Sequence, residues 1–229
     1  MIVNIKKFDW LNEENKYLYI IDNASKDGDI DILNSWINNL NYPYTNKAID
    51  YISYNGDEKI LEWWKNSGLE LKYTKDAIDL ASKNGYVNIL EWWKNSGLEL
   101  KYTTLSIDMA SKNKNIEVLE WWKNSGLELK YTENTIDYAS MDKELKIIKW
   151  WENSGLELKY TKYSMDIASS CGNINLLNWW LKSGLEIKYS EEAIDKALKY
   201  KNINVLEWWL NSGLEIKYSE KAIKRIFRN

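Results

Sequence analysis

The chain has 229 residues and a formal net charge of -3, with one cysteine, one proline and no histidine. This composition excludes an intramolecular disulfide, histidine-ligated metal sites and histidine-assisted nucleophilic catalysis. The acidic balance opposes a general affinity for nucleic acid or anionic membranes, because both need a basic face. The first residues lack the apolar core of a signal peptide, and no apolar run approaches the roughly 18 residues of a spanning helix, so we expect a soluble, intracellular protein without a membrane partner.

One segment recurs along the chain at a fixed spacing of 29 residues. It carries a Trp-Trp pair, followed two residues later by Ser-Gly-Leu-Glu, then Leu or Ile, Lys, Tyr, and Thr or Ser. The pairs are Trp63/Trp64, Trp92/Trp93, Trp121/Trp122, Trp150/Trp151, Trp179/Trp180 and Trp208/Trp209. Repetition at this period is typical of a solenoid, in which each unit packs on its neighbours. We therefore predict a single elongated repeat domain over residues 1–229.

The two ends of the chain depart from the repeat. Residues 1–16 match no unit, and their apolar side chains predict an N-terminal cap over the first repeat. Residues 17–44 form an imperfect first repeat that is one residue short and has Pro43 in its connection. Six regular repeats fill residues 45–218, and residues 219–229 predict a C-terminal capping helix with a basic outer face.

The range Thr74–Tyr102 represents the regular unit. Thr74 is a favourable N-cap and Gly85 can end a helix in the left-handed conformation, so we predict a short helix A between them. A second helix, helix B, is predicted over Asn88–Ser96. Helices this short are marginal in isolation, so packing between repeats must stabilise them.

The connector Leu98–Tyr102 alternates apolar and polar residues, a pattern that also fits a short strand. Such strands would turn the fold into an α/β solenoid. We favour an extended connector, because only five residues precede the next helix cap. The predicted fold class is therefore all-α, an α-solenoid of stacked helix-turn-helix repeats.

The unit Ala77–Gly97 resembles the two-helix part of an ankyrin repeat. Its Ala-Ser-Lys-Asn-Gly and the following Ser-Gly-Leu-Glu are similar to that family's Ala-Ala-x-x-Gly and Ala-Gly-Ala-Asp, and the similarity extends through seven units. The repeat has 29 residues against the family's 33, which implies short or absent β-hairpin fingers. The family's Thr-Pro-Leu-His is replaced by Asp76-Ala77-Ile78-Asp79, and its leucine pair by Trp-Trp.

Short, Trp-bearing, Asn- and Lys-rich versions of this repeat are similar to the ankyrin-type proteins of giant DNA viruses of amoebae, such as mimivirus. The resemblance implies a non-enzymatic scaffold for protein-protein interaction in the host cytoplasm. Its partner would be a host or viral protein.

Two sets of positions hardly change between repeats. We expect both tryptophans in the core, more firmly the second, with an exposed aromatic ladder as the alternative for the first. The other set is an acidic column, which is made up of Asp50, Asp79, Asp108, Asp137, Asp166 and Asp195. Repeated carboxylates fit Ca²⁺ or acid/base chemistry, but stacking places them roughly 10 Å apart, too far to share an ion at about 2.4 Å per ligand. We favour hydrogen bonds to connector amides or a Tyr hydroxyl of the next repeat.

Variation is concentrated in helix A, along one stripe of three columns four and three residues apart. The first column is Lys47, Asp76, Leu105, Asn134, Tyr163 and Glu192; the middle column is Tyr51, Leu80, Met109, Tyr138, Ile167 and Lys196; the last is Tyr54, Lys83, Lys112, Met141, Ser170 and Lys199. A surface that meets a non-repetitive partner need not repeat, so we predict that this helix A stripe is a binding groove. In ankyrin-like stacks it faces the concave side.

The predicted partner-binding residues are Tyr51, Tyr54, Leu80, Lys83, Met109, Lys112, Tyr138, Met141, Tyr163 and Lys199. The middle column fits inter-repeat core equally well, and the last column is favoured for contact. No Gly-rich phosphate loop, metal-ligand cluster or nucleophile with a base is apparent, so we expect no enzyme activity and no catalytic, metal or cofactor site. We interpret Cys171 as a small residue beside Gly172 rather than a reactive thiol.

Two other functions remain open at this stage. Nucleic acid or nucleoprotein could bind through Lys83, Lys112 and Lys199 with Tyr54 and Tyr200 interleaved. The Trp-rich helix B surfaces could instead join chains into a self-assembling structural protein. We expect a monomer or a weak homo-oligomer.

Overall fold

A computed structural model describes residues 19–37, 43–220 and 222, which form seven consecutive helix pairs. The first helices of the pairs, helices A, are α2 (Ile20–Asp27), α4 (Lys47–Asn55), α6 (Asp76–Asn84), α8 (Leu105–Lys112), α10 (Asn134–Ala139), α12 (Tyr163–Ser170) and α14 (Glu192–Lys199). The second, helices B, are α3 (Ile30–Ile37), α5 (Glu58–Asn66), α7 (Val87–Asn95), α9 (Ile116–Asn124), α11 (Lys146–Ser154), α13 (Ile174–Lys182) and α15 (Ile203–Asn211). No strand occurs in these residues, so the connectors are extended, as predicted.

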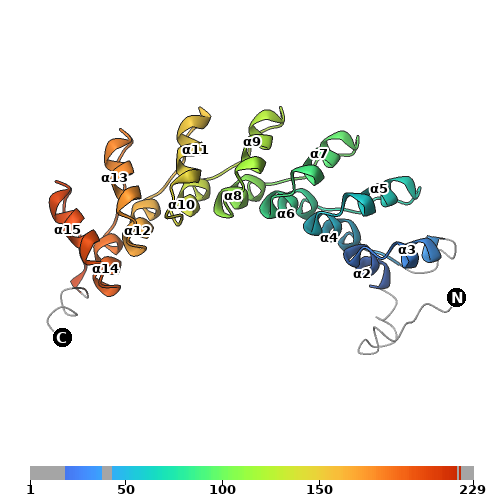
Figure 1. The fold of residues 1–229 in the computed structure, drawn as a ribbon, viewed down its shortest axis with the longest axis horizontal. Helices are drawn as coiled ribbons and strands as arrows, with labels where there is room; N and C mark the ends of the chain where they lie inside the picture. Colours follow the sequence, from blue (N-terminus) through green and yellow to red (C-terminus); the bar gives the residue numbers. More distant parts are fainter. Residues whose placement is uncertain (1–18, 38–42, 221, 223–229) are drawn as a thin grey trace.

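The helix pairs stack into an open arc (Figure 1). Helices A lie on the inner, concave side of the arc, and helices B project toward its outer side. The prediction of an all-helical tandem repeat is confirmed. The predicted N-terminal cap, residues 1–16, lies outside the described residues, and of the predicted capping helix 219–229 only Ser219, Glu220 and Ala222 are described. In the described part of the chain, every helix is too short or too polar to cross a lipid bilayer.

Short polar side chains define where each helix begins and ends. In the third pair, the Thr74 hydroxyl accepts a hydrogen bond from the Asp76 amide at 3.1 Å. Gly85 ends the helix in the left-handed conformation, with φ of 85°. After helix B, the Ser96 hydroxyl donates to the Trp93 carbonyl at 2.7 Å and accepts from the Leu98 amide at 3.1 Å. In this pair the Thr, Gly and Ser-Gly positions therefore mark the beginning and end of the helices, as the sequence indicated.

The fifth pair departs from the regular repeat. Its helix A, α10, ends at Ala139, and Leu145 rather than Lys143 takes the left-handed conformation, with φ of 58°. Between them lies Asp142, which is only 4% exposed. The Lys114 ammonium of the preceding repeat is 2.7 Å from the Asp142 carboxylate and compensates its burial. The sequence alone did not predict this irregular turn.

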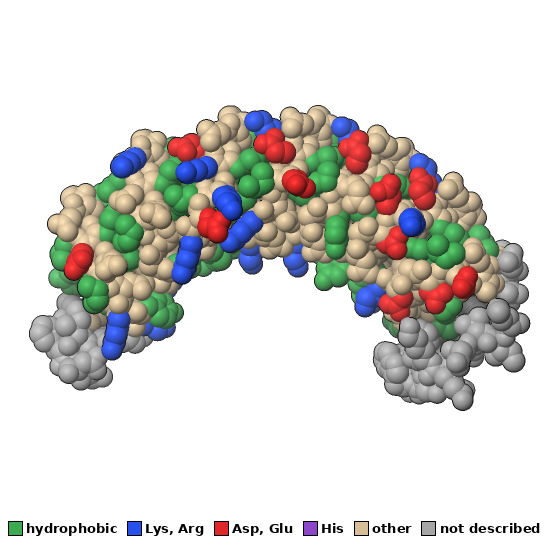
Figure 2. Space-filling model, viewed as in Figure 1, with side chains coloured by type: hydrophobic (Ala, Val, Ile, Leu, Met, Phe, Trp, Pro, Cys, Tyr) green, Lys and Arg blue, Asp and Glu red, His purple; other side chains and the backbone are tan. Residues whose placement is uncertain are grey.

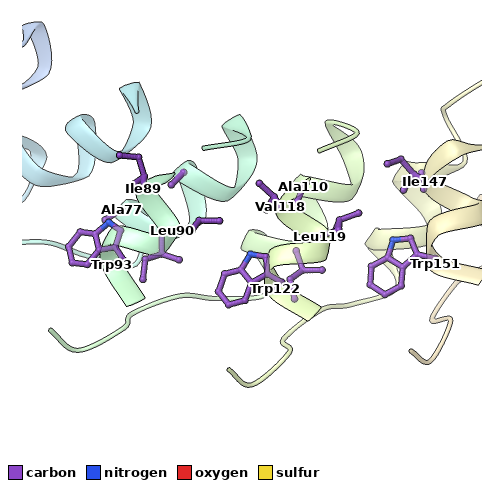
Figure 3. Close-up of a cluster of buried hydrophobic side chains, with 14 of the residues drawn as sticks. Ala77, Ile89, Leu90, Trp93, Ala110, Val118, Leu119, Trp122, Ile147 and Trp151 are labelled. Carbon is purple, nitrogen blue, oxygen red and sulfur yellow. The ribbon is translucent and has the colours of Figure 1, made fainter. Parts of the chain in front are cut away.

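The second tryptophan of each pair forms the centre of the core. Trp64, Trp93, Trp122, Trp151, Trp180 and Trp209 are each 0–1% exposed, as predicted. Figure 3 shows Trp93, Trp122 and Trp151 in one row, with Leu90 and Leu119 between successive indoles. Because each indole buries on the order of 200 Å², this row supplies much of the apolar area that holds the stack together.

Five of the six second-column indoles also have a hydrogen-bond acceptor in the preceding repeat. The Trp122 Nε1 group donates to the Ser82 hydroxyl of α6 at 3.1 Å. The same bond joins Trp64 to Ser25, Trp93 to Ser53, Trp151 to Ser111, and Trp209 to Ser169. At Trp180 this bond is missing, and the hydroxyl of the corresponding Ser140 donates to the Ile136 carbonyl.

The connector tyrosines join the repeats on another side. The Tyr73 ring packs against Trp93 with ring centroids 4.7 Å apart, and its hydroxyl donates to the Glu99 carbonyl of the next connector at 3.0 Å. The Lys101 ammonium lies 4.6 Å from the centre of the Tyr73 ring. This arrangement explains why Lys and Tyr recur in every connector: each Lys forms a cation–π contact with the preceding Tyr.

The serine acceptors give a matched test of the stack. We expect Ser82→Ala to lower the free energy of unfolding by ~1–3 kcal/mol, because the buried Trp122 N–H loses its acceptor. Ser140→Ala should cost less, since Trp180 has no bond to lose there. Urea unfolding of both variants measures the difference, and equal losses would contradict the role given to the indole bond.

Candidate functional site

The carboxylates of the acidic column join successive repeats, and all are buried except that of Asp195, which is half-buried. The Asp79 carboxylate accepts from the Thr103 amide at 2.9 Å and the Thr103 hydroxyl at 2.6 Å, and the Ser106 hydroxyl also donates to it. The same pair of bonds joins Asp22 to Thr45, Asp50 to Thr74, Asp108 to Thr132, Asp137 to Thr161, Asp166 to Ser190, and Asp195 to Ser219. The carboxylates do accept from the next repeat, as predicted, but from the amide of the Thr or Ser cap that follows the connector rather than from a connector amide. The Tyr hydroxyls donate instead to main-chain carbonyls.

The environment of these carboxylates does not favour metal or acid/base chemistry. In the described ranges, no three His, Cys, Asp or Glu side chains are grouped to hold a metal ion. Burial raises the pKa of the Asp108 carboxyl above its ordinary value, although hydrogen bonds from Thr132 pull that pKa down. The folded chain therefore binds this proton more readily than the unfolded chain, so Asp108 adds stability as the pH falls toward its ordinary pKa and does not drive acid unfolding.

The first tryptophan column is not an exposed aromatic ladder. Trp92 is buried and the other five are half-buried against the core. Their indole groups mostly donate to a Glu or Asn of the preceding helix B, as Trp121 donates to Glu91 at 2.7 Å. This bond is the main reason that the pKa of Glu91 lies below its ordinary value. The column therefore belongs to the framework as well.

The helix A stripe lies on the concave side of the arc. All six members of its first column are exposed. The middle column is half-buried throughout, so it is neither sealed core nor open surface. In the last column Tyr54, Lys112, Met141 and Lys199 are exposed, and Lys83 and Ser170 are half-buried. The ten predicted partner-binding residues thus lie on one face of the helices A, exposed or half-buried.

An apolar area occupies the middle of this stripe. Leu105 of α8, Met141 after α10 and Tyr163 of α12 are 43%, 40% and 36% exposed. The half-buried middle column adds Met109, Tyr138 and Ile167 between them. We call these six residues the central apolar patch. Leu105 and Ile167 were not among the predicted contacts, but their place in the variable columns was the signal that could have identified them.

Lysines surround the central apolar patch. The eighteen stripe positions hold five lysines and two acids, an excess of three positive charges in a chain whose net charge is -3. The Lys112 ammonium lies 4.7 Å from the centre of the Tyr138 ring, while Lys196 is paired with Glu192 at 2.8 Å. Figure 2 shows lysine side chains projecting from the inner edge through the middle and C-terminal half of the arc. Acidic side chains gather near the inner edge of the N-terminal arm.

These observations define an all-helical tandem-repeat protein. Its packing positions are the same from repeat to repeat, and one face varies between repeats. A stretch of 50 residues, 22% of this chain, is 48% identical to an uncharacterized protein of Acanthamoeba polyphaga mimivirus. The match spans 16% of that protein's length, and the similarity suggests an origin in a giant virus. No known protein family model matches the chain.

The unpaired indole of Trp179 offers a test of the first tryptophan column. Lys149 stands where the preceding helices carry Glu91 and Glu120, so the Trp179 N–H has no acceptor. We expect Lys149→Glu to raise the free energy of unfolding by ~0.5–1.5 kcal/mol. By analogy with Glu91, the gain should be present above the ordinary pKa of glutamate and weaken as the pH falls through the lowered pKa.

Lys143→Glu is the matched control for this variant, because it makes the same charge change on an exposed side chain. Urea unfolding at several pH values measures both. If Lys143→Glu stabilises the protein equally, a general charge effect accounts for the gain.

A second prediction concerns the acidic column. We expect Asp79→Asn to destabilise the protein by ~1–3 kcal/mol, because an amide nitrogen cannot accept the hydrogen bond from the Thr103 hydroxyl. Asp76→Asn, on the exposed side of the same helix, should change stability little. Thermal and urea unfolding check both variants, and similar losses would show that the charge of helix α6 matters rather than the inter-repeat bond.

Proposed function

We propose that this protein is an ankyrin-type repeat scaffold that binds a host or viral protein on its concave helix A stripe and catalyses no reaction. The two-helix unit, its left-handed Gly85 and the Ser-Gly turn after helix B support the ankyrin-type assignment. The partial similarity to a mimivirus protein supports a viral setting, with the host cytoplasm as the place of action.

The observation that carries this proposal is the contrast between framework and stripe within a single chain. Framework residues, such as Asp79 and Trp93, are repeated and buried, because each meets an identical neighbour. The stripe residues change from repeat to repeat and stay accessible. Side chains that differ between repeats and lie on a concave face suit the recognition of a partner whose own surface does not repeat.

The composition of the stripe indicates the chemistry of that partner. The central apolar patch favours an apolar segment, because exposed apolar area of this kind marks interaction surfaces. The excess of lysines favours acidic residues beside that segment and would speed their association. A second candidate, nucleic acid, is favoured by Lys83, Lys112 and Lys199 lying in one column with Tyr54 and Tyr200 exposed near them.

An affinity capture from amoebal cell extract with the full chain as bait tests the proposal. We expect the variant with Tyr54→Ala, Lys83→Ala and Met141→Ala together to lose the captured protein by ~10-fold or more, since a few anchors dominate such interfaces. The control changes Lys65, Lys94 and Lys123 to Ala, three exposed helix B positions on the outer side.

Equal capture by the stripe variant and the unchanged chain would contradict binding at this face. Capture that disappears after nuclease treatment, with a steep dependence on salt, would favour nucleic acid instead.

A further inference from the structure

The last helix B of the described residues, α15, presents an apolar face that no described element covers. In earlier repeats the centre of the corresponding face is covered by the helix B of the next pair, while the position equivalent to Leu210 stays exposed. Its central residues there, Leu61, Leu90, Leu119, Ile148 and Leu177, are 0–1% exposed. On α15 the equivalent Leu206 is half-buried, and no helix B follows it in the part of the chain that is described.

Two more apolar side chains extend this face of α15. Ile203 is 58% exposed and Leu210 is 73% exposed. With Leu206 they stand at positions i, i+3 and i+7, which places all three on one side of the helix. This spacing is the one by which paired helices form a packed seam. We call these three residues the α15 seam.

The α15 seam is not a requirement of the repeat. The helices α7 and α15 differ at three positions only, and the one change of charge is Lys94 to Leu210. Lysine also stands at this position in α5 and α9, as Lys65 and Lys123. On α15 this lysine is replaced by leucine, and the Leu210 side chain is 73% exposed.

We propose that the α15 seam is the contact by which two copies of this chain form a tail-to-tail dimer. A helix B of this same chain is what covers the position of Leu206 in each earlier repeat, and a second copy presents such a helix, α15, with the same apolar face. The contact is then the same patch on both chains, which closes after two copies. The only charged residue of α15 is Glu207, so the seam itself has no charge to repel its copy.

The other end of the arc does not fit the α15 seam. A head-to-tail contact would place α3 of the second copy against α15. The face by which α7 packs on the preceding helix B includes Asn88 and Trp92. On α3 those positions are Asp31 and Ser35, an acid and a small polar residue. By the same equivalence, such a contact would place the Asp31 carboxylate beside Ile203, as Asn88 lies beside Glu58, and would lack the indole that Lys65 meets at the position of Leu210. It is therefore disfavoured, and an open filament with it.

The groove between α13 and α15, beside the α15 seam, supports the same proposal. Between α5 and α7 the groove is lined by Glu58, Glu62 and Lys65 among others. The equivalent groove between α13 and α15 is lined by Ile174, Asn178 and Leu181 at those positions. The outer side of the last two repeats has thus lost the charges that earlier repeats carry there. The dimer would leave both concave stripes open and place two of them in one particle.

The oligomeric state of the full chain tests this proposal. We expect sedimentation equilibrium to show twice the mass of the single 27.2 kDa chain. The double variant Ile203→Glu, Leu210→Lys should fall to the mass of one chain under the same conditions. The fold accepts both residues at these positions, because α5 carries Glu58 and Lys65 there. Circular dichroism of the variant verifies that it is folded.

Leu181→Lys is the matched control, because it restores the same lysine one repeat earlier, on α13, and should leave the dimer intact. A monomeric unchanged chain at high concentration would overturn the proposal. A dimer that survives the double variant would also overturn it, and so would an open series of higher oligomers, which indicates a head-to-tail contact.

Discussion

The rest of this structure depends on the burial of one indole in each repeat, with its N–H bonded to the helix A of the repeat before. Neither helix of a pair is long enough to persist alone, so stability must come from stacking. The indole supplies the apolar area, and its N–H needs an acceptor because an unpaired buried donor costs ~1–3 kcal/mol. Trp122 finds that acceptor in Ser82, forty residues earlier. Only one register of stacking satisfies both needs, and the Asp and Tyr links follow from it.

The same constraint explains where the chain is free to vary. Framework side chains meet the same partner residues at successive junctions between repeats, so a change in one would have to be matched by its partner. Contacts between stripe side chains of neighbouring repeats, such as Lys112 on the Tyr138 ring, are not repeated at every junction, so the stripe can differ from unit to unit. The junction after the fifth pair is the least regular, since Trp179 and Trp180 both lack an acceptor there. Tyr138 and Met141 of the central apolar patch lie at that junction, which fits the tendency of local rules to be broken where a protein binds its partner.

Much of this fold could be predicted from the sequence because it repeats. Helix ends at Thr74, Gly85 and Ser96 follow from local chemistry, and the period places the Thr and Ser positions in the regular units, whereas lysine fills the glycine position in three of them. The pairing of Trp with Ser could not be predicted, because the partners stand forty residues apart and serine has many acceptors and donors within reach. The early end of α10 was also missed: Lys143 fills the glycine position, yet Leu145 takes the left-handed turn while Asp142 is buried against Lys114. The early end of α10 goes together with an ion pair between two repeats, which the local sequence does not reveal. The stripe columns could be derived from the helical period, but the central apolar patch within them needed the exposure of Leu105 and Ile167.

Hydrogen exchange of the tryptophan indole N–H groups, followed residue by residue by NMR, tests the stacking most directly. The five indoles bonded to a serine should exchange slowly, on the timescale of cooperative opening of the stack, and Trp180, buried but unbonded, should exchange faster. If Trp93, Trp122 and Trp151 instead exchanged as quickly as exposed side chains, the continuous row of buried indoles would not exist in solution, and the variable face built on it would lose its support.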